Sequence, residues 1–344
     1  MIKVAQQFTG HNLSSGLLTD FKNSMSIQND ELSMISFWCD SQKYKTPLQQ
    51  IKFYKKKAKE NSPDICVVRG LGPESLYAII GLKLGGVKKI IVGIHGMYSD
   101  LTHICFLKKI FCKKIMEPLI LKKSTFFYTV YNNFERQDLI RKYRKKYYGF
   151  IYNPVDSKRM ACNSYVATKE KKDIINFLYL GRIEKEKGIG EYIGAIEQIT
   201  KLYDDCFFTF VGSGSYKILS KNHKIRVLPE TSETFKFYSN SEVFVLPSYH
   251  ENLPFSLLEA ASYGCYCVAT NVGGVSEIAK CIPNCIVIPP KSKDALAEAL
   301  LKMRKDIGEN GFRRFKPNFD SFSFETYCSK MVDVITKTQR NCKK

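Results

Sequence analysis

The sequence predicts an α/β protein built from two doubly wound domains, each a parallel sheet with helices on both faces. Short apolar runs rich in β-branched and aromatic residues alternate along the chain with segments of helical periodicity. The length of 344 residues suits two domains of roughly 150 to 200 residues, and a hydrophobic fraction of 44% can fill two cores. Neither an internal repeat nor a heptad pattern is present, which excludes solenoids and coiled coils.

The first half carries five predicted strands, ended by glycine or polar residues. They cover residues 2–8, 32–38, 64–70, 88–96 and 126–132. Segments with helix-period apolar positions lie between them, at residues 16–25, 47–60, 73–85 and 134–146. Strand and helix in regular alternation indicate a parallel sheet with both faces covered.

The second half repeats this scheme, and its predicted strands cover residues 175–182, 207–214, 224–230, 241–248, 265–271 and 285–290. The segment 152–160 is the best place to divide the two halves. We therefore expect an N-terminal domain over 1–158, a second domain over 159–320 and a terminal helix within 321–344. That helix has apolar positions at Tyr327, Met331, Val334 and Ile335. Two such domains facing each other would form a cleft lined by the carboxyl ends of both sheets, where open α/β sheets bind ligands.

Charge is distributed unevenly along the chain, whose formal net charge is +20. Residues 1–165 hold 27 basic and 12 acidic side chains, and residues 166–344 hold 26 and 21, so the two halves face different surfaces or partners. No apolar stretch is long enough for a membrane span, and the first residues do not resemble a signal peptide. The twelve cysteines are scattered without a C-x2-C pair, which is typical of reduced thiols in a cytoplasmic protein.

The stretch SYHENLPFSLLEAASYG, residues 248–264, places Glu251 and Glu259 eight positions apart. It predicts a loop at the carboxyl end of a strand, followed by a helix with Pro254 near its first turn and Gly264 at its end. Free N–H groups at a helix start suit a phosphate, and paired carboxylate oxygens suit sugar hydroxyls. On spacing alone, the simpler interpretation is that Glu251 is a charge at a helix start and Glu259 a solvated helix position.

Three further segments carry groups that could meet a phosphate. LGRIEKEKG offers Arg182 and Lys187 after a strand, as cations for a pyrophosphate or as ordinary surface charge. FVGSGSY contains Gly212 and Gly214 in a strand-to-helix turn, without the full G-x-G-x-x-G pattern. TNVGGVSEI gives a turn in which glycine lets the backbone approach a ligand.

Taken in chain order, from LGRIEKEKG through FVGSGSY and SYHENLPFSLLEAASYG to TNVGGVSEI, the four segments resemble the motif series of retaining glycosyltransferases of family 4, enzymes of the GT-B fold, with Glu251 and Glu259 as the E-x7-E element. The resemblance is dense from about residue 176 to 280 and looser over the first half. It implies that Glu251 contacts the transferred sugar and that Glu259 holds the ribose hydroxyls of a nucleotide. Arg182 and Lys187 would then stabilise the leaving diphosphate.

The resemblance also implies supporting donor-binding residues. Backbone amides around Asn252, Leu253 and Pro254 would face the donor, although proline itself has no N–H. Gly212 and Leu228 would border the nucleotide, with Leu228 near the base. In the first half, His95 would reach the donor sugar and Gly16 would begin the first phosphate-facing turn. The terminal helix within 321–344 would cross back onto the N-terminal domain. Ser15 and Arg69 depart from the family pattern, which often has a second glycine and a histidine at these two places.

We therefore expect a cytoplasmic glycosyltransferase that moves a sugar from a nucleoside-diphosphate sugar to a lipid-linked glycan acceptor. Its product would belong to the biosynthesis of a surface polysaccharide, O-antigen or capsule. The sequence contains no D-x-D element, and the two cations can serve the diphosphate, so we expect neither a metal nor a cofactor. A nucleotide-sugar epimerase of the same architecture is an alternative, and so is an inactive relative. The positive net charge suggests nucleic-acid binding as another alternative. The sequence contains no nucleic-acid-binding motif, so we expect no nucleic-acid partner.

Residues 103–116 predict a basic amphipathic helix. A regular helix places Ile104, Leu107, Phe111 and Ile115 within one arc of roughly 80°, and six lysines fall between residues 108 and 123. The helix either packs its apolar arc on the first sheet or docks the enzyme peripherally on the anionic inner face of the cytoplasmic membrane. The pattern alone leaves both open.

Overall fold

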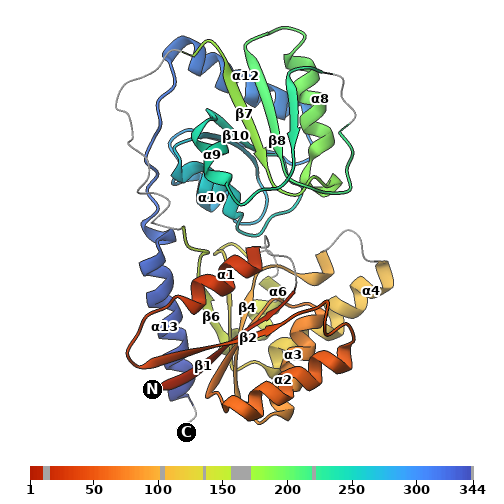
Figure 1. The fold of residues 1–344 in the computed structure, drawn as a ribbon, viewed down its shortest axis with the longest axis vertical. Coiled ribbons are helices and arrows are strands. Elements are labelled where there is room, and N and C mark those ends of the chain that lie inside the picture. Colours follow the sequence, from red (N-terminus) through yellow and green to blue (C-terminus); the bar gives the residue numbers. More distant parts are fainter. Residues whose placement is uncertain (11–15, 101–104, 135–136, 156–171, 219–221, 342–344) are drawn as a thin grey trace. The chain divides into compact units, whose positions relative to one another are not determined.

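The computed structural model describes residues 1–10, 16–100, 105–134, 137–155, 172–218 and 222–341, and the chain folds into two compact units. The first unit comprises Met1–Pro154 together with Phe324–Lys344, and the second comprises Val155–Ser323. The predicted division after residue 158 lies outside the described residues. Figure 1 shows that each unit has a sheet with helices on both faces, the α/β arrangement predicted from the sequence.

The first unit contains a parallel sheet of six strands in the order β2-β1-β3-β4-β5-β6. Its strands are β1 (Ile2–Thr9), β2 (Leu32–Cys39), β3 (Ile65–Arg69), β4 (Lys89–Ile94), β5 (Phe126–Thr129) and β6 (Tyr147–Phe150). The first five match predicted strands. Strand β6, a half-buried edge strand, was not predicted from the sequence.

Helices cover both faces of this sheet (Figure 1). They are α1 (Gly16–Met25), α2 (Pro47–Asn61), α3 (Pro73–Leu84), α4 (Phe106–Phe111), the π-helix η2 (Cys112–Met116), α5 (Glu117–Lys123), α6 (Gln137–Lys142) and α13 (Phe324–Arg340), with short 3-10 turns η1 (Tyr98–Asp100) and η3 (Arg144–Lys146). The predicted helix over 134–146 is therefore only partly helical, because its end forms a 3-10 turn. Thr46 caps α2 with a complete capping box, which fixes where that helix begins.

The terminal helix α13 belongs to the core of the first unit. Its predicted apolar positions, Tyr327, Met331, Val334 and Ile335, are all buried in one cluster with β-strand residues such as Val67. Figure 1 shows α13, in blue, beside the red and yellow elements of this unit. The last helix of the chain is therefore a structural part of the unit that contains its first residues.

The second unit has a parallel sheet in the order β12-β11-β10-β7-β8-β9. Its strands are β7 (Ile175–Leu180), β8 (Cys206–Val211), β9 (Ile225–Leu228), β10 (Val243–Leu246), β11 (Tyr266–Thr270) and β12 (Cys285–Ile288), and all were predicted. Its helices are η4 (Lys185–Lys187), α8 (Ile189–Ile199), α9 (Thr234–Ser239), α10 (Phe255–Ser262), α11 (Val275–Ala279), α12 (Lys293–Asn310) and η5 (Asp320–Phe322). The core packs α8 and α12 against the central strands.

In each sheet, the order in which successive strands are added reverses at one place, the topological switch point. In the first sheet β1 and β3 are neighbours while β2 lies on the other side of β1, and in the second sheet β7 and β10 meet in the same way. Ligands of open α/β sheets bind at the carboxyl ends of strands at such a switch point. The loops after β1, β3, β7 and β10 are therefore the places to look for a site. Among the described helices, none is long and apolar enough to span a membrane.

Candidate functional site

An ion pair lies at the switch point of the second unit. Lys187, at the end of η4 after β7, places its Nζ 2.6 Å from Oε1 of Glu251, in the loop after β10. The same carboxylate oxygen accepts a hydrogen bond of 2.7 Å from the Ser248 hydroxyl. Only 17% of the lysine side chain and 13% of the glutamate side chain are exposed. Two residues predicted independently from separate motifs are thus brought together.

Two glycines let the loops that carry this pair approach closely. Gly188 has a φ of 70°, and a Cβ there would lie 1.9 Å from the Pro247 carbonyl oxygen. Gly273 has a φ of 53°, and a Cβ there would lie 2.0 Å from the Glu251 carbonyl oxygen. We expected the glycines after β11 to make room for a ligand. In the structure, Gly273 makes room for the loop that holds the acid.

Helix α10 begins directly after this loop. Pro254 is its N-cap residue, no side chain caps its first turn, and Gly264 follows its end with a φ of 72°, as predicted. Glu259 lies half-buried on this helix, and its Oε2 accepts a hydrogen bond of 3.1 Å from the hydroxyl of the buried Tyr238. The acid is therefore held in place by α9 rather than freely solvated, which the sequence did not indicate.

An open pocket of about 440 Å³ lies over the ends of β8 and β9. Gly212 and Leu228 line it, and the Gly212 N–H donates a 3.0 Å hydrogen bond to the Leu228 carbonyl. A Cβ on Gly212 would lie 1.9 Å from the Gly181 carbonyl oxygen, so this glycine allows the turns after β7 and β8 to pack together. The pocket is lined by both apolar and polar groups, because apolar side chains such as Val227 lie beside backbone groups and Ser213.

The other residues predicted for the donor are less enclosed or contribute through backbone. The Arg182 side chain is 65% exposed, and its Nη1 lies 3.8 Å from Glu186, so it does not join the buried pair. Leu253 and Pro254 have buried side chains. The Asn252 carbonyl accepts a 2.6 Å hydrogen bond from the Gly274 N–H. These contacts fix the loop after β10 against the turn after β11.

In the first unit, His95 follows β4 and lies beside a buried acid. Its Nε2 is 3.3 Å from Oδ2 of Asp20. Arg69 Nε donates to the same oxygen at 2.6 Å, and the Tyr327 hydroxyl of α13 lies 3.0 Å from Oδ1. Burial by itself raises the pKa of Asp20, but Arg69 and His95 outweigh burial and hold that pKa well below its usual range.

Arg69 occupies the switch point of the first sheet. Its guanidinium also donates to the Gln7 carbonyl at 3.0 Å, to Gln6 Oε1 at 3.0 Å and to the Ser24 hydroxyl. The residue that departs from the family pattern is therefore a buried structural cation with its hydrogen bonds satisfied. Sequence reasoning missed Asp20, because no local pattern marks a residue whose partners lie so far along the chain. Gly16 begins α1, and the turn before it lies outside the described residues.

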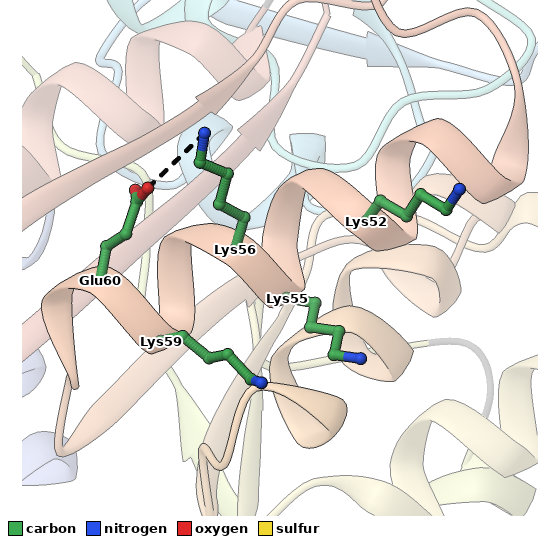
Figure 2. A pocket seen from close by; sticks show the side chains of 5 residues that line it. All are labelled: Lys52, Lys55, Lys56, Lys59 and Glu60. Carbon is green, nitrogen blue, oxygen red and sulfur yellow. Dashed lines mark ion pairs between the residues drawn. The ribbon is translucent and has the colours of Figure 1, made fainter.

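A separate shallow hollow lies on α2, where Figure 2 shows Lys52, Lys55, Lys56 and Lys59 with Glu60. One ion pair of 3.7 Å joins Lys56 to Glu60. These residues lie on the helix surface rather than at the carboxyl ends of strands, so we assign no site to them. Among the described residues, no group of three or more His, Cys, Asp or Glu side chains could hold a metal ion.

Comparison with known proteins finds a family model that matches most of the second unit. Residues 165–314 match the family model described as glycosyl transferases group 1. A Bacillus subtilis protein named for teichuronic acid biosynthesis, TuaC, is 30% identical over 169 residues, which cover 47% of this chain and 42% of that protein. The capsular polysaccharide biosynthesis glycosyltransferase CapH of Staphylococcus aureus is 23% identical over 248 residues, covering 71% and 64%.

The fold also matches over nearly the whole chain. Anabaena Alr3699/HepE, solved in complex with UDP, superposes with a TM-score of 0.67 at 12% identity, covering 98% of this chain and 100% of the other. This likeness shows a two-domain GT-B fold. By sequence, the aligned region spans only about half the length of TuaC and 64% of CapH. The residues that match the glycosyl transferases group 1 model, 165–314, include Lys187, Glu251 and Glu259 of the candidate site.

Proposed function

We propose that this chain, whose second unit is a glycosyltransferase group 1 domain, is a retaining glycosyltransferase of family 4 that uses a nucleoside-diphosphate sugar. The observation that carries the proposal is the Lys187–Glu251 ion pair at the switch point, beside the uncapped start of α10. A cation and free helix N–H groups suit a diphosphate, and a carboxylate beside them suits the sugar attached to it.

The remaining donor contacts follow from the neighbouring elements. Glu259 would accept hydrogen bonds from the ribose hydroxyls, and the pocket bordered by Gly212 and Leu228 would hold the base. Arg182, whose side chain is exposed, would reorient towards the ligand and help to neutralise the negative charge of the diphosphate. We propose that these cations make a metal ion unnecessary for transfer, and that no cofactor is used.

The acceptor is proposed to be a growing glycan on a lipid carrier, in the synthesis of a surface polysaccharide such as O-antigen or capsule. Relatives named for teichuronic acid and capsule biosynthesis support this substrate class. His95 of the first unit would contact the donor sugar, as the family resemblance implies. The enzyme would work in the cytoplasm, peripherally on the inner face of the cytoplasmic membrane, where lipid-linked acceptors lie.

A two-step experiment tests the proposal. A thermal-shift screen of nucleoside-diphosphate sugars identifies the donor, because a ligand that binds only the folded state raises Tm. Transfer of the radiolabelled sugar to membrane lipid extracts is then measured with and without chelator. We expect acceptor-dependent transfer that chelator leaves intact. Donor conversion without any acceptor would instead indicate an epimerase, and rescue of a chelated enzyme by a divalent cation would refute the metal-free mechanism.

A further inference from the structure

The segment from α4 to η2 exposes an unusual number of apolar side chains. Phe106, Leu107, Ile110, Phe111 and Ile115, called the apolar strip below, are between 42% and 77% exposed. No residue of α4 is buried. Three of the predicted arc residues are thus in solvent rather than packed on the sheet, while Ile104 lies outside the described residues. The structure therefore contradicts the reading in which these three side chains pack on the first sheet.

The same segment packs on its unit through a different face. Cys112, Met116, Ile120 and Leu121 are buried and attach η2 and α5 to the unit. The π-helix at Cys112–Met116 widens the turn, so side chains after it are rotated relative to a regular helix. The predicted regular helix over 103–116 is wrong in this respect. The segment therefore has buried side chains that attach it to the unit and exposed side chains that form the apolar strip. Figure 1 shows α4 at the edge of the first unit.

Lysines lie beside the apolar strip on the same helices. Lys108, Lys109, Lys113 and Lys114 belong to α4 and η2, and Lys122 and Lys123 follow in α5. The only acid between residues 105 and 123 is Glu117, which is buried and accepts a 2.8 Å hydrogen bond from the Ser99 N–H. Within the described part of the chain, none of the first four lysines forms a salt bridge. Lys108 instead lies 5.7 Å from the ring centre of Tyr98.

We propose that the apolar strip and its four lysines, Lys108, Lys109, Lys113 and Lys114, form a docking surface for an anionic lipid bilayer. Aromatic and aliphatic side chains enter the boundary between headgroups and acyl chains, and lysines beside them bind anionic headgroups. A second copy of the chain fits poorly, because a two-fold contact would oppose lysines with lysines. The role of the surface rests on the proposed lipid-linked acceptor, but lipid binding itself requires no transfer.

Vesicle flotation of the full chain without any sugar nucleotide tests the surface. We expect binding to vesicles containing phosphatidylglycerol, weakened by high salt, and little binding to vesicles of phosphatidylcholine alone. Replacing the four lysines by glutamine should reduce partitioning by about fivefold for each lysine. The matched control replaces Lys52, Lys55, Lys56 and Lys59 on α2, which removes the same charge from the same unit (Figure 2) and should change binding far less.

The apolar contribution is tested separately. Leu107→Ser with Phe111→Ser should release the chain from anionic vesicles at moderate salt, while Leu84→Ser on α3, also exposed, should not. Equal binding to both vesicle types, equal loss in the two lysine variants, or no binding at all would overturn the proposal. A dimer in light scattering that Leu107→Ser disrupts would assign the strip to a second copy. Nucleotide binding, measured in solution on the same variants, tests the proposed function independently.

Discussion

The ammonium of Lys187 and the carboxylate of Glu251 lie 2.6 Å apart although 64 residues separate them in the chain. Because both side chains are largely buried, each is the main partner of the other's charge when no ligand is bound. A nucleoside diphosphate that binds here must therefore compete with Glu251 for the lysine or share it. The pair links donor affinity to the acid that the proposed mechanism places at the sugar.

Removing the charge of Glu251 should separate binding from turnover. Glu251→Gln keeps the size of the side chain but frees Lys187 for the diphosphate, so nucleoside-diphosphate affinity should rise about tenfold while turnover falls at least about a hundredfold. Isothermal calorimetry and single-turnover kinetics measure the two effects. Lys187→Gln should weaken the same nucleotide instead.

The matched control is Glu298→Gln, an exposed acid on α12 that loses the same charge in the same unit. It should leave both measurements unchanged. Unaltered affinity in both Glu251→Gln and Lys187→Gln would mean that the pair does not face the diphosphate. The candidate site would then have to be placed elsewhere on the second unit.

Glu259 should affect nucleotide binding more than catalysis. Glu259→Gln removes an acceptor for ribose hydroxyls, so we expect nucleotide affinity to fall about tenfold with little change in kcat. Tyr238→Phe keeps the acid but removes the hydroxyl that orients it, and should lower nucleotide affinity about threefold. Calorimetry with nucleoside diphosphate measures both. A larger effect of Tyr238→Phe than of Glu259→Gln would show that the hydroxyl, not the acid, contacts the nucleotide.

The strands were predictable because buried parallel strands appear in sequence as continuous apolar runs. In β10, all of Val243–Leu246 are buried, and the run is plain in the sequence. Strand β6 was missed because its residues are only half-buried and its run YYGF directly follows a basic segment. The π-helix at Cys112–Met116 was missed because nothing in the residue pattern distinguishes it from a regular turn.

The site was predictable only where a local motif marked it. Glu251, Glu259 and Lys187 lie in recognisable motifs after strands, but Tyr238, the partner of Glu259, does not. Tyr238 reaches Glu259 from α9, and Asp20 meets Arg69 across 49 residues. Such contacts depend on the order of strands and on which helix packs where, which a single sequence does not specify.

The glycines beside the ion pair should be intolerant of substitution. Gly273→Ala would place a Cβ 2.0 Å from the Glu251 carbonyl oxygen in a left-handed backbone conformation, so the loop must move. We expect at least about a hundredfold loss of activity, measured at saturating donor, with a folded circular-dichroism spectrum. Gly308→Ala on α12 meets nothing within 4 Å and should leave activity intact while raising stability by up to about 1 kcal/mol. Normal activity in Gly273→Ala would show that the loop position is not critical.

The last prediction concerns the buried acid of the first unit. Arg69 is 4% exposed and Asp20 is 1% exposed, so Asp20→Asn leaves a buried guanidinium without its counter-charge and should cost about 3 to 5 kcal/mol of unfolding free energy at pH 7. The folded-state pKa of Asp20 is lowered, so the stability that its charge contributes is present above the unfolded carboxyl pKa of about 3.9 and is lost as pH falls below it. The difference in unfolding free energy between wild type and Asp20→Asn should therefore become smaller at acidic pH.

Urea unfolding from pH 7 down to about pH 3 measures this gap, and fluorescence makes it specific to the first unit. The single tryptophan of the chain, Trp38, lies in β2 with its ring centroid 6.0 Å from that of Phe21, one residue after Asp20 on α1. Asp30→Asn, at an exposed position, is the control and should follow wild type at every pH. A gap that stays constant down to the lowest pH would mean that the Asp20 charge does not stabilise the fold. Because Asp20 also lies against His95, the variant should in addition lower kcat more than it raises KM if the acid positions that imidazole for the donor sugar.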